Sequence, residues 1–84
     1  MSSLADLPNV GKVLEENLLG AGIKTAEELR SIGAEEAFVR IRTKVDSGAC
    51  LHMLYGIQGA IDGIPDKSLR TETKERLKAF FRTL

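Results

Sequence analysis

The sequence contains few of the residues that cross-link small proteins. Its 84 residues include a single cysteine, Cys50, and a single histidine, His52. One cysteine excludes an internal disulfide, and one cysteine with one histidine leaves too few soft ligands for a zinc site. We therefore expect no metal and no cofactor, and a chain that is held together by its apolar core.

Net charge and long hydrophobic runs are also missing. Twelve Lys and Arg residues balance twelve Asp and Glu residues, which disfavours a polybasic binder of nucleic acid or membranes. No window approaches the roughly 18 apolar residues of a membrane span, and the N-terminus lacks the features of a signal peptide. We expect a single domain over residues 1–84, in the cytoplasm, without membrane contact.

The zero net charge is the sum of two oppositely charged ends. Residues 1–36 hold seven acidic and three basic side chains, a net charge of −4. Residues 67–84 hold six basic and two acidic side chains, a net charge of +4. A local basic face is therefore compatible with the neutral total.

Helical patterns fill the chain, and no stretch shows the alternation and β-branched enrichment of a strand. This predicts an all-α fold, a compact domain of five to six helices with short connections. Thr25 and Glu28 form a capping box that starts one helix, and Gly33 is expected to separate this helix from the next. The expected helices cover residues 12–19, 25–32, 34–45, 49–63 and 70–84.

Apolar spacing predicts which side chains are buried. Segment 49–63 is apolar on nearly all sides, which indicates the central helix. Its internal glycines, Gly56 and Gly59, each cost about 1 kcal/mol relative to alanine, so we expect a close helix crossing there. The buried stripe of the first helix is expected to contain Val10, Val13, Leu14, Leu18 and Leu19. The buried stripe of the third is expected to contain Ala34, Ala37, Phe38, Ile41 and Val45.

No arrangement in the sequence predicts catalysis. Cys50 and His52 are residue types that can form a catalytic thiol–imidazole pair. Residues two apart on a helix point about 200° apart, however, so these two side chains cannot share a proton. We expect Cys50 to be buried and His52 to lie at the core boundary or to have a polar partner. Acidic pairs at 15–16, 27–28 and 35–36 lie early in their helices, where negative charge stabilises the helix dipole. We therefore expect that the protein is not an enzyme.

One turn carries a recognisable motif. Residues 7–12 read Leu-Pro-Asn-Val-Gly-Lys, and Gly-Ile-Lys-Thr at 22–25 precedes a second helix. The pattern resembles the helix-hairpin-helix motif, in which helix N-termini hold DNA phosphate without reading sequence. We expect left-handed backbone at Asn9 and Gly11, and only a short helix, residues 2–6, before the turn. The candidate phosphate-binding residues are Asn9, Val10, Gly11, Lys12 and Lys24. A turn that only joins packed helices is the alternative.

A wider resemblance covers residues 4–82. Its further blocks are Gly-Ile-Lys-Thr-Ala-Glu-Glu-Leu at 22–29, Gly-Ala-Glu-Glu-Ala-Phe at 33–38, and Ala-Cys-Leu-His-Met-Leu-Tyr-Gly-Ile-Gln-Gly-Ala-Ile at 49–61. In order and spacing these blocks resemble the TfoX C-terminal domain family. The resemblance implies a SAM-like fold in a bacterial cytoplasmic protein, with a link to natural competence. Two-domain members carry a preceding α/β domain, so we expect a stand-alone copy here.

Basic side chains gather on the third and last helices, where three interpretations stay open. They form solvated faces favoured by the helix dipole, a phosphate-binding face, or a surface for an acidic protein. The adjacent Phe80 and Phe81 point about 100° apart, so one is expected to be partly exposed. The candidate partner-binding residues are Arg40, Arg42, Lys44, Arg76 and Phe81.

These features together predict a non-enzymatic regulatory or protein-interaction module, linked to competence or transcription regulation. Its expected partner is an unidentified protein or a second copy in a homodimer. The alternative is a weak, sequence-independent DNA-binding domain that uses the helix-hairpin-helix-like turn.

Overall fold

A computed structural model describes residues 3–84, and every regular element within them is helical. The elements are the 3-10 helix η1 (Leu4–Asp6), α1 (Lys12–Gly20), α2 (Ala26–Lys44), α3 (Leu51–Asp62), the 3-10 helix η2 (Asp66–Ser68) and α4 (Thr71–Phe81). The predicted all-α class is confirmed, while the expected start of the first short helix at Ser2 lies outside the described residues. None of the described helices is long and apolar enough to span a bilayer.

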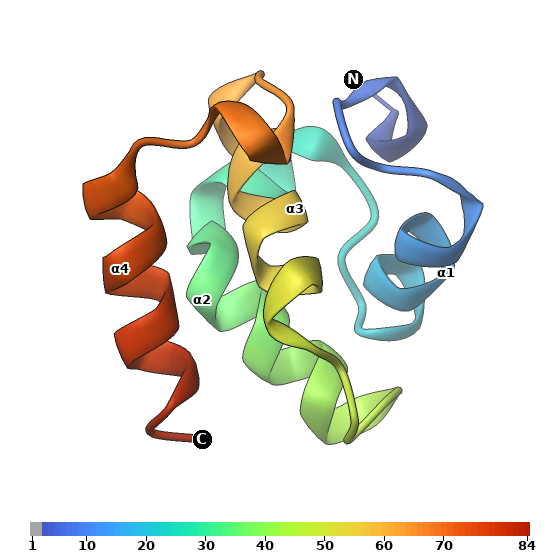
Figure 1. The fold of residues 1–84 in the computed structure, drawn as a ribbon. Coiled ribbons are helices and arrows are strands. Elements are labelled where there is room, and N and C mark those ends of the chain that lie inside the picture. The colour runs from blue at the N-terminus through green and yellow to red at the C-terminus, as the bar shows by residue number, and fades with distance from the viewer. Residues whose placement is uncertain (1–2) are drawn as a thin grey trace.

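The helices are arranged around α2 and α3. Figure 1 shows these two helices in the middle of the domain, with α4 on one side and η1 and α1 on the other. α3 packs against α2, α4 and η2, which confirms its prediction as the central helix. The largest fully buried side chains are Leu4, Leu18, Ile23, Leu29, Phe38, Ile41, Leu54, Ile57 and Leu77.

α2 unites the two helices that the sequence places on either side of Gly33. Thr25 begins the element as expected, because its side-chain oxygen accepts a hydrogen bond from the Glu28 N–H at 3.1 Å and satisfies one free donor of the first turn. Gly33 has φ 85° and ψ 165°, a non-helical conformation essentially restricted to glycine, so two helical stretches meet there at a kink, as predicted. With α2 counted as one kinked element, residues 3–84 contain four α-helices, and the expected number of five to six helices is not confirmed.

Three apolar side chains predicted to be buried are exposed instead. Val13 is 71% exposed, Leu19 47% and Val45 43%. α1 lies at the edge of the domain, where it buries Leu18 completely and Leu14 in part. Neighbouring elements cover only a small part of the circumference of a helix at the edge. The buried stripe of α1 is therefore narrower than its apolar pattern indicates. Val45 lies beyond the last turn of α2, as its C-cap.

The last helix buries fewer of its apolar side chains completely than its sequence predicts. Leu77 is fully buried, whereas Phe80 and Phe81 are both only partly buried against the core. Beyond the end of α4, Leu84 is exposed. The C-terminal end of α4 therefore presents aromatic and aliphatic surface beside the C-terminal end of α2.

Candidate functional site

The turn before α1 has half of the backbone geometry that the motif predicts. Asn9 has a φ of 67°, in the left-handed region, as expected. Gly11 has a φ of −86° and is the N-cap of α1, so the prediction of a left-handed Gly11 is wrong. One left-handed residue suffices here, because the Val10 N–H already donates to the Leu7 carbonyl oxygen at 3.3 Å and closes the turn.

The side chain of Asn9 forms hydrogen bonds with distant parts of its own chain. Its Nδ2 donates to the carbonyl oxygens of Gly56, at 3.3 Å, and Ile64, at 3.0 Å. Its Oδ1 accepts a hydrogen bond from the Asp66 N–H at 3.1 Å. We call these three bonds the Asn9 clamp. They use both amide N–H donors of Asn9 and connect the turn to α3, to the loop after it and to η2.

The two glycines inside α3 lie under this clamp. A Cβ atom at Gly59 would lie 2.5 Å from Asn9 Nδ2 and 2.7 Å from the Ile64 carbonyl oxygen. A Cβ atom at Gly56 would lie 3.7 Å from Asn9 Cβ, an ordinary contact distance. The expectation of a close helix crossing is therefore wrong. Gly59 makes room for a side chain and a loop, both from outside α3.

The other candidate phosphate-binding residues differ in their exposure. Val10 is buried and belongs to the core. Lys12 begins α1, Lys24 precedes α2, and both are exposed. No side chain caps the N-terminus of α1, whose first N–H groups lack intrahelical partners, and Glu15 places a negative charge in the same turn. The turn can therefore offer an anion these backbone N–H groups and Lys12, whereas the Asn9 side chain is already engaged and Lys24 lies beyond the opposite end of α1.

Two of the candidate partner-binding residues contact each other. The guanidinium carbon of Arg42 lies 5.5 Å from the ring centroid of Phe81 and 5.9 Å from that of Phe38. Its Nη1 also donates to the Ala49 carbonyl oxygen at 3.1 Å. Cation–π contacts of this kind stabilise the pairing of an arginine with aromatic faces. Arg42 thus joins the C-terminal part of α2 to the end of α4.

The remaining three candidates lie in separate surroundings. Arg40 pairs with Glu36 one turn earlier, with 2.9 Å between Nε and Oε2, and a pair this exposed contributes little stability. Lys44 ends α2 and is exposed. Arg76 donates from Nη2 to Gln58 Oε1 at 3.3 Å, between α4 and α3.

Cys50 and His52 are both exposed at the start of α3. The prediction that Cys50 is buried is wrong, because Cys50 is the N-cap of α3 and precedes the apolar face of that helix. The His52 ring packs edge-on against the Tyr55 ring, with 6.2 Å between centroids. Within residues 3–84, no three His, Cys, Asp or Glu side chains are grouped so that they could hold a metal ion.

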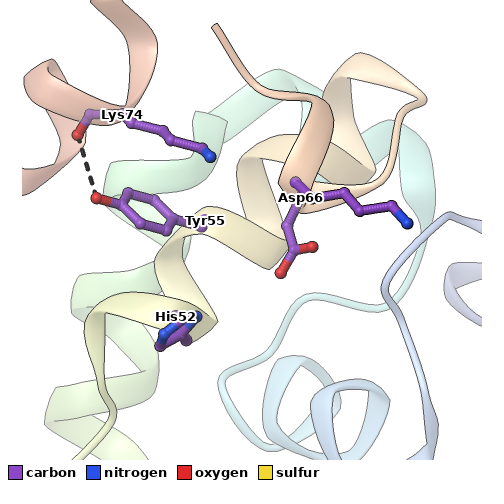
Figure 2. Close-up of a pocket in the computed structure, with 5 residues that line it drawn as sticks. His52, Tyr55, Asp66 and Lys74 are labelled. Atoms are coloured by element: carbon purple, nitrogen blue, oxygen red, sulfur yellow. Dashed lines mark hydrogen bonds between the residues drawn. The ribbon is translucent and has the colours of Figure 1, made fainter. Parts of the chain in front are cut away.

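An open pocket of about 200 Å³ lies between α3, η2 and α4, and no sequence pattern predicts it. We call it the lysine pocket; it is lined by His52, Tyr55, Asp66, Lys67 and Lys74. Figure 2 shows His52 and Tyr55 projecting from α3 and Lys74 reaching from α4 toward η2. The Tyr55 hydroxyl donates to the Lys74 carbonyl oxygen at 3.5 Å. The sequence could have indicated only that His52 and Tyr55, three residues apart, lie on one face of a helix. The other lining residues, Asp66, Lys67 and Lys74, come from different segments.

The two glycines of α3 give a direct test of the clamp. Gly59→Ala should lower the free energy of unfolding by about 1–3 kcal/mol, because its methyl group overlaps Asn9 and the Ile64 carbonyl. Gly56→Ala meets no such obstacle and should leave stability unchanged or raise it by up to about 1 kcal/mol through helix propensity. Denaturant unfolding followed by circular dichroism measures both. Equal effects of the two substitutions would contradict the clamp.

Solved structures with the same arrangement of helices come from Listeria monocytogenes. A triclinic crystal form of an uncharacterized protein superposes with a TM-score of 0.94 at 45% identity, covering 98% of this chain and 92% of that one. A tetragonal form of a protein of unknown function gives a TM-score of 0.91 at 46% identity, covering 95% and 96%. Identity at this level accompanies a shared fold over nearly the whole of both chains.

Two relatives of known name are longer than this chain. The DNA transformation protein TfoX of Haemophilus influenzae is 36% identical over 77 residues, and protein Sxy of Escherichia coli is 35% identical over 74 residues. The matches cover 92% and 88% of this chain but 35% of each relative, so the chain spans about a third of their length. The family model of the TfoX C-terminal domain matches residues 1–81. The chain belongs to the TfoX C-terminal domain family.

Proposed function

We propose that this domain is a non-enzymatic regulatory module that works by binding another protein, in a role linked to competence or transcription regulation. The name of the Haemophilus relative, a DNA transformation protein, supports the link to competence. A bacterial cytoplasmic location, a single domain over residues 1–84 and a SAM-like arrangement of the helices belong to the same proposal. The contact of Arg42 with Phe81 is the observation that carries it.

The proposed binding surface is the basic-aromatic end, which we define as Arg42, Lys44, Phe81 and Leu84, at or just beyond the C-terminal ends of α2 and α4. Arg42 holds the C-terminal ends of α2 and α4 together through Phe81, and both ends lie on one side of the domain in Figure 1. Lys44 is the last residue of α2, Leu84 follows the end of α4, and both are exposed. Arginine and aromatic side chains are enriched among residues that dominate binding energy. Because Arg42 is already fixed by the Ala49 carbonyl, little side-chain entropy is lost on binding.

The surface can be tested by substituting Lys44 and Leu84, whose exposed side chains form no hydrogen bond or ion pair within residues 3–84. Lys44→Glu with Leu84→Ser should weaken capture of the partner from a bacterial extract about fivefold or more, because charge and apolar contact are both lost. Lys24→Glu with Val13→Ser makes the same changes elsewhere on the surface and should leave capture intact. Quantitative mass spectrometry of the bound proteins measures the difference, with circular dichroism as a check on folding. Equal capture by both double variants would overturn the proposal.

Sequence-independent DNA binding is the second candidate, and the exposed pair Lys12 and Lys24 favours it. Contacts with phosphates would make the affinity fall steeply as salt rises, with little difference between unrelated duplexes. Lys12→Glu with Lys24→Glu should weaken this binding, whereas Lys78→Glu should not. Fluorescence anisotropy at two salt concentrations provides the measurement. No binding of duplex DNA at low salt would exclude this candidate.

A further inference from the structure

The lysine pocket carries more positive than negative charge. Lys67 and Lys74 contribute two ammonium groups, and Asp66 contributes one carboxylate. Within residues 3–84 the one salt bridge is the pair of Arg40 and Glu36, so neither pocket lysine has a carboxylate in direct contact. Both lysines line the same open pocket, and Figure 2 shows the Lys74 side chain extending toward it, so their positive charge favours an anionic group in the pocket.

Hydrogen bonds hold the walls of the pocket in place before any ligand arrives. The Tyr55 hydroxyl reaches the α4 wall through a long hydrogen bond to the Lys74 carbonyl oxygen, at 3.5 Å. The Asn9 clamp fixes the start of η2 through the Asp66 N–H at 3.1 Å. Leu69, directly after η2, is buried in the core. A site whose walls are already fixed loses less conformational entropy on binding than a mobile one.

We propose that the lysine pocket binds a side-chain carboxylate from an acidic protein segment, with Lys67 and Lys74 as its charged contacts. The Tyr55 ring supplies an apolar wall for the methylene groups of that side chain. A single carboxylate matches the net charge of +1 that Lys67, Lys74 and Asp66 give the pocket. The inference rests on the proposed function, because it supplies the chemistry of the protein partner.

Residues 67–84 have a net charge of +4, but the carboxylates in and beside the pocket disfavour nucleic acid there. Asp66 lies in the pocket itself, and Glu72 and Glu75 share α4 with Lys74. Duplex DNA carries one negative charge per roughly 1.7 Å of its length, so it would bring several phosphates against these carboxylates. A peptide presents its carboxylates singly on flexible side chains, and one of them can enter alone.

A charge-matched set of variants tests the pocket in the full chain. The probe is a glutamate-rich peptide blocked at both ends, titrated into the protein and followed by NMR of the backbone amides. Lys67→Gln and Lys74→Gln should each weaken binding by about two- to fivefold, the range of an exposed charge pair. The control Lys24→Gln removes the same charge outside the pocket and should have a smaller effect.

Asp66→Asn should change the peptide affinity in the opposite direction from the lysine variants. It removes the carboxylate that repels the peptide, so the affinity should rise by about two- to fivefold. A variant that merely loosens the fold would not produce this gain, and circular dichroism checks that each variant is folded. A rise in affinity with Asp66→Asn together with losses in both pocket lysine variants supports the proposal.

Several outcomes would overturn it. Equal losses in all three lysine variants would mean that the peptide senses only net charge, and no binding of the peptide would remove the site. Inorganic phosphate that shifts the pocket amides where the peptide does not would identify a free anion as the ligand. Duplex DNA that displaces the peptide with higher affinity would assign the pocket to nucleic acid.

Self-association and partner capture complete the test. Reversible self-association of the chain that both pocket lysine variants weaken would identify a second copy as the source of the acidic segment, and would support the proposal. The peptide assay does not involve the basic-aromatic end. If the pocket variants bind the peptide no differently from Lys24→Gln while Lys44→Glu with Leu84→Ser still weakens partner capture, this inference alone is overturned. If the pocket effects hold but both double variants capture the partner equally, only the proposed function is overturned.

Discussion

The side chain of Asn9 connects segments of the domain that are far apart in the sequence. It bonds to Gly56, 47 residues away, to Ile64, 55 residues away, and to Asp66, 57 residues away. The partners are all backbone groups: the Gly56 carbonyl inside α3, the Ile64 carbonyl in the loop after it, and the Asp66 N–H at the start of η2. The first N–H groups of a helix lack partners within it, so the Asn9 amide supplies an acceptor that η2 itself does not offer to Asp66. The arrangement requires glycine at position 59, because any side chain there would occupy the place of the amide.

The clamp affects both candidate sites, the turn at Asn9 and the lysine pocket beside Asp66. An asparagine that bonds to its own chain through both amide hydrogens has little left to offer a phosphate, although its left-handed backbone gives the turn the shape of the DNA-binding motif. The same asparagine fixes the backbone of Asp66, next to Lys67 in the lysine pocket. The turn thus resembles a phosphate-binding motif, but its Asn9 side chain holds the backbone of η2 beside the lysine pocket.

Local signals in the sequence predicted the helical class, the Thr25 cap and the interruption at Gly33, because each depends on a few neighbouring residues. Burial was predicted well for α3, which has neighbours on several sides, and poorly for α1, where Val13 and Leu19 are exposed. The clamp and the lysine pocket could not be predicted, because their members meet only in the folded chain. Gly59 was singled out as costly in a helix, but its partner, Asn9, is 50 residues away.

The central claim is that the Asn9 side chain ties the turn to η2, and amide hydrogen exchange of Asp66 tests it most directly. Asn9→Gly keeps a residue that tolerates the left-handed backbone and removes only the side chain. The account predicts that the Asp66 amide exchanges markedly faster in this variant, since its acceptor is gone. The Ile64 amide, which bonds to the Gly59 carbonyl oxygen at 2.9 Å, serves as the internal reference, and its rate should change less. An Asp66 amide that exchanges at the same rate with and without the Asn9 side chain would contradict the account.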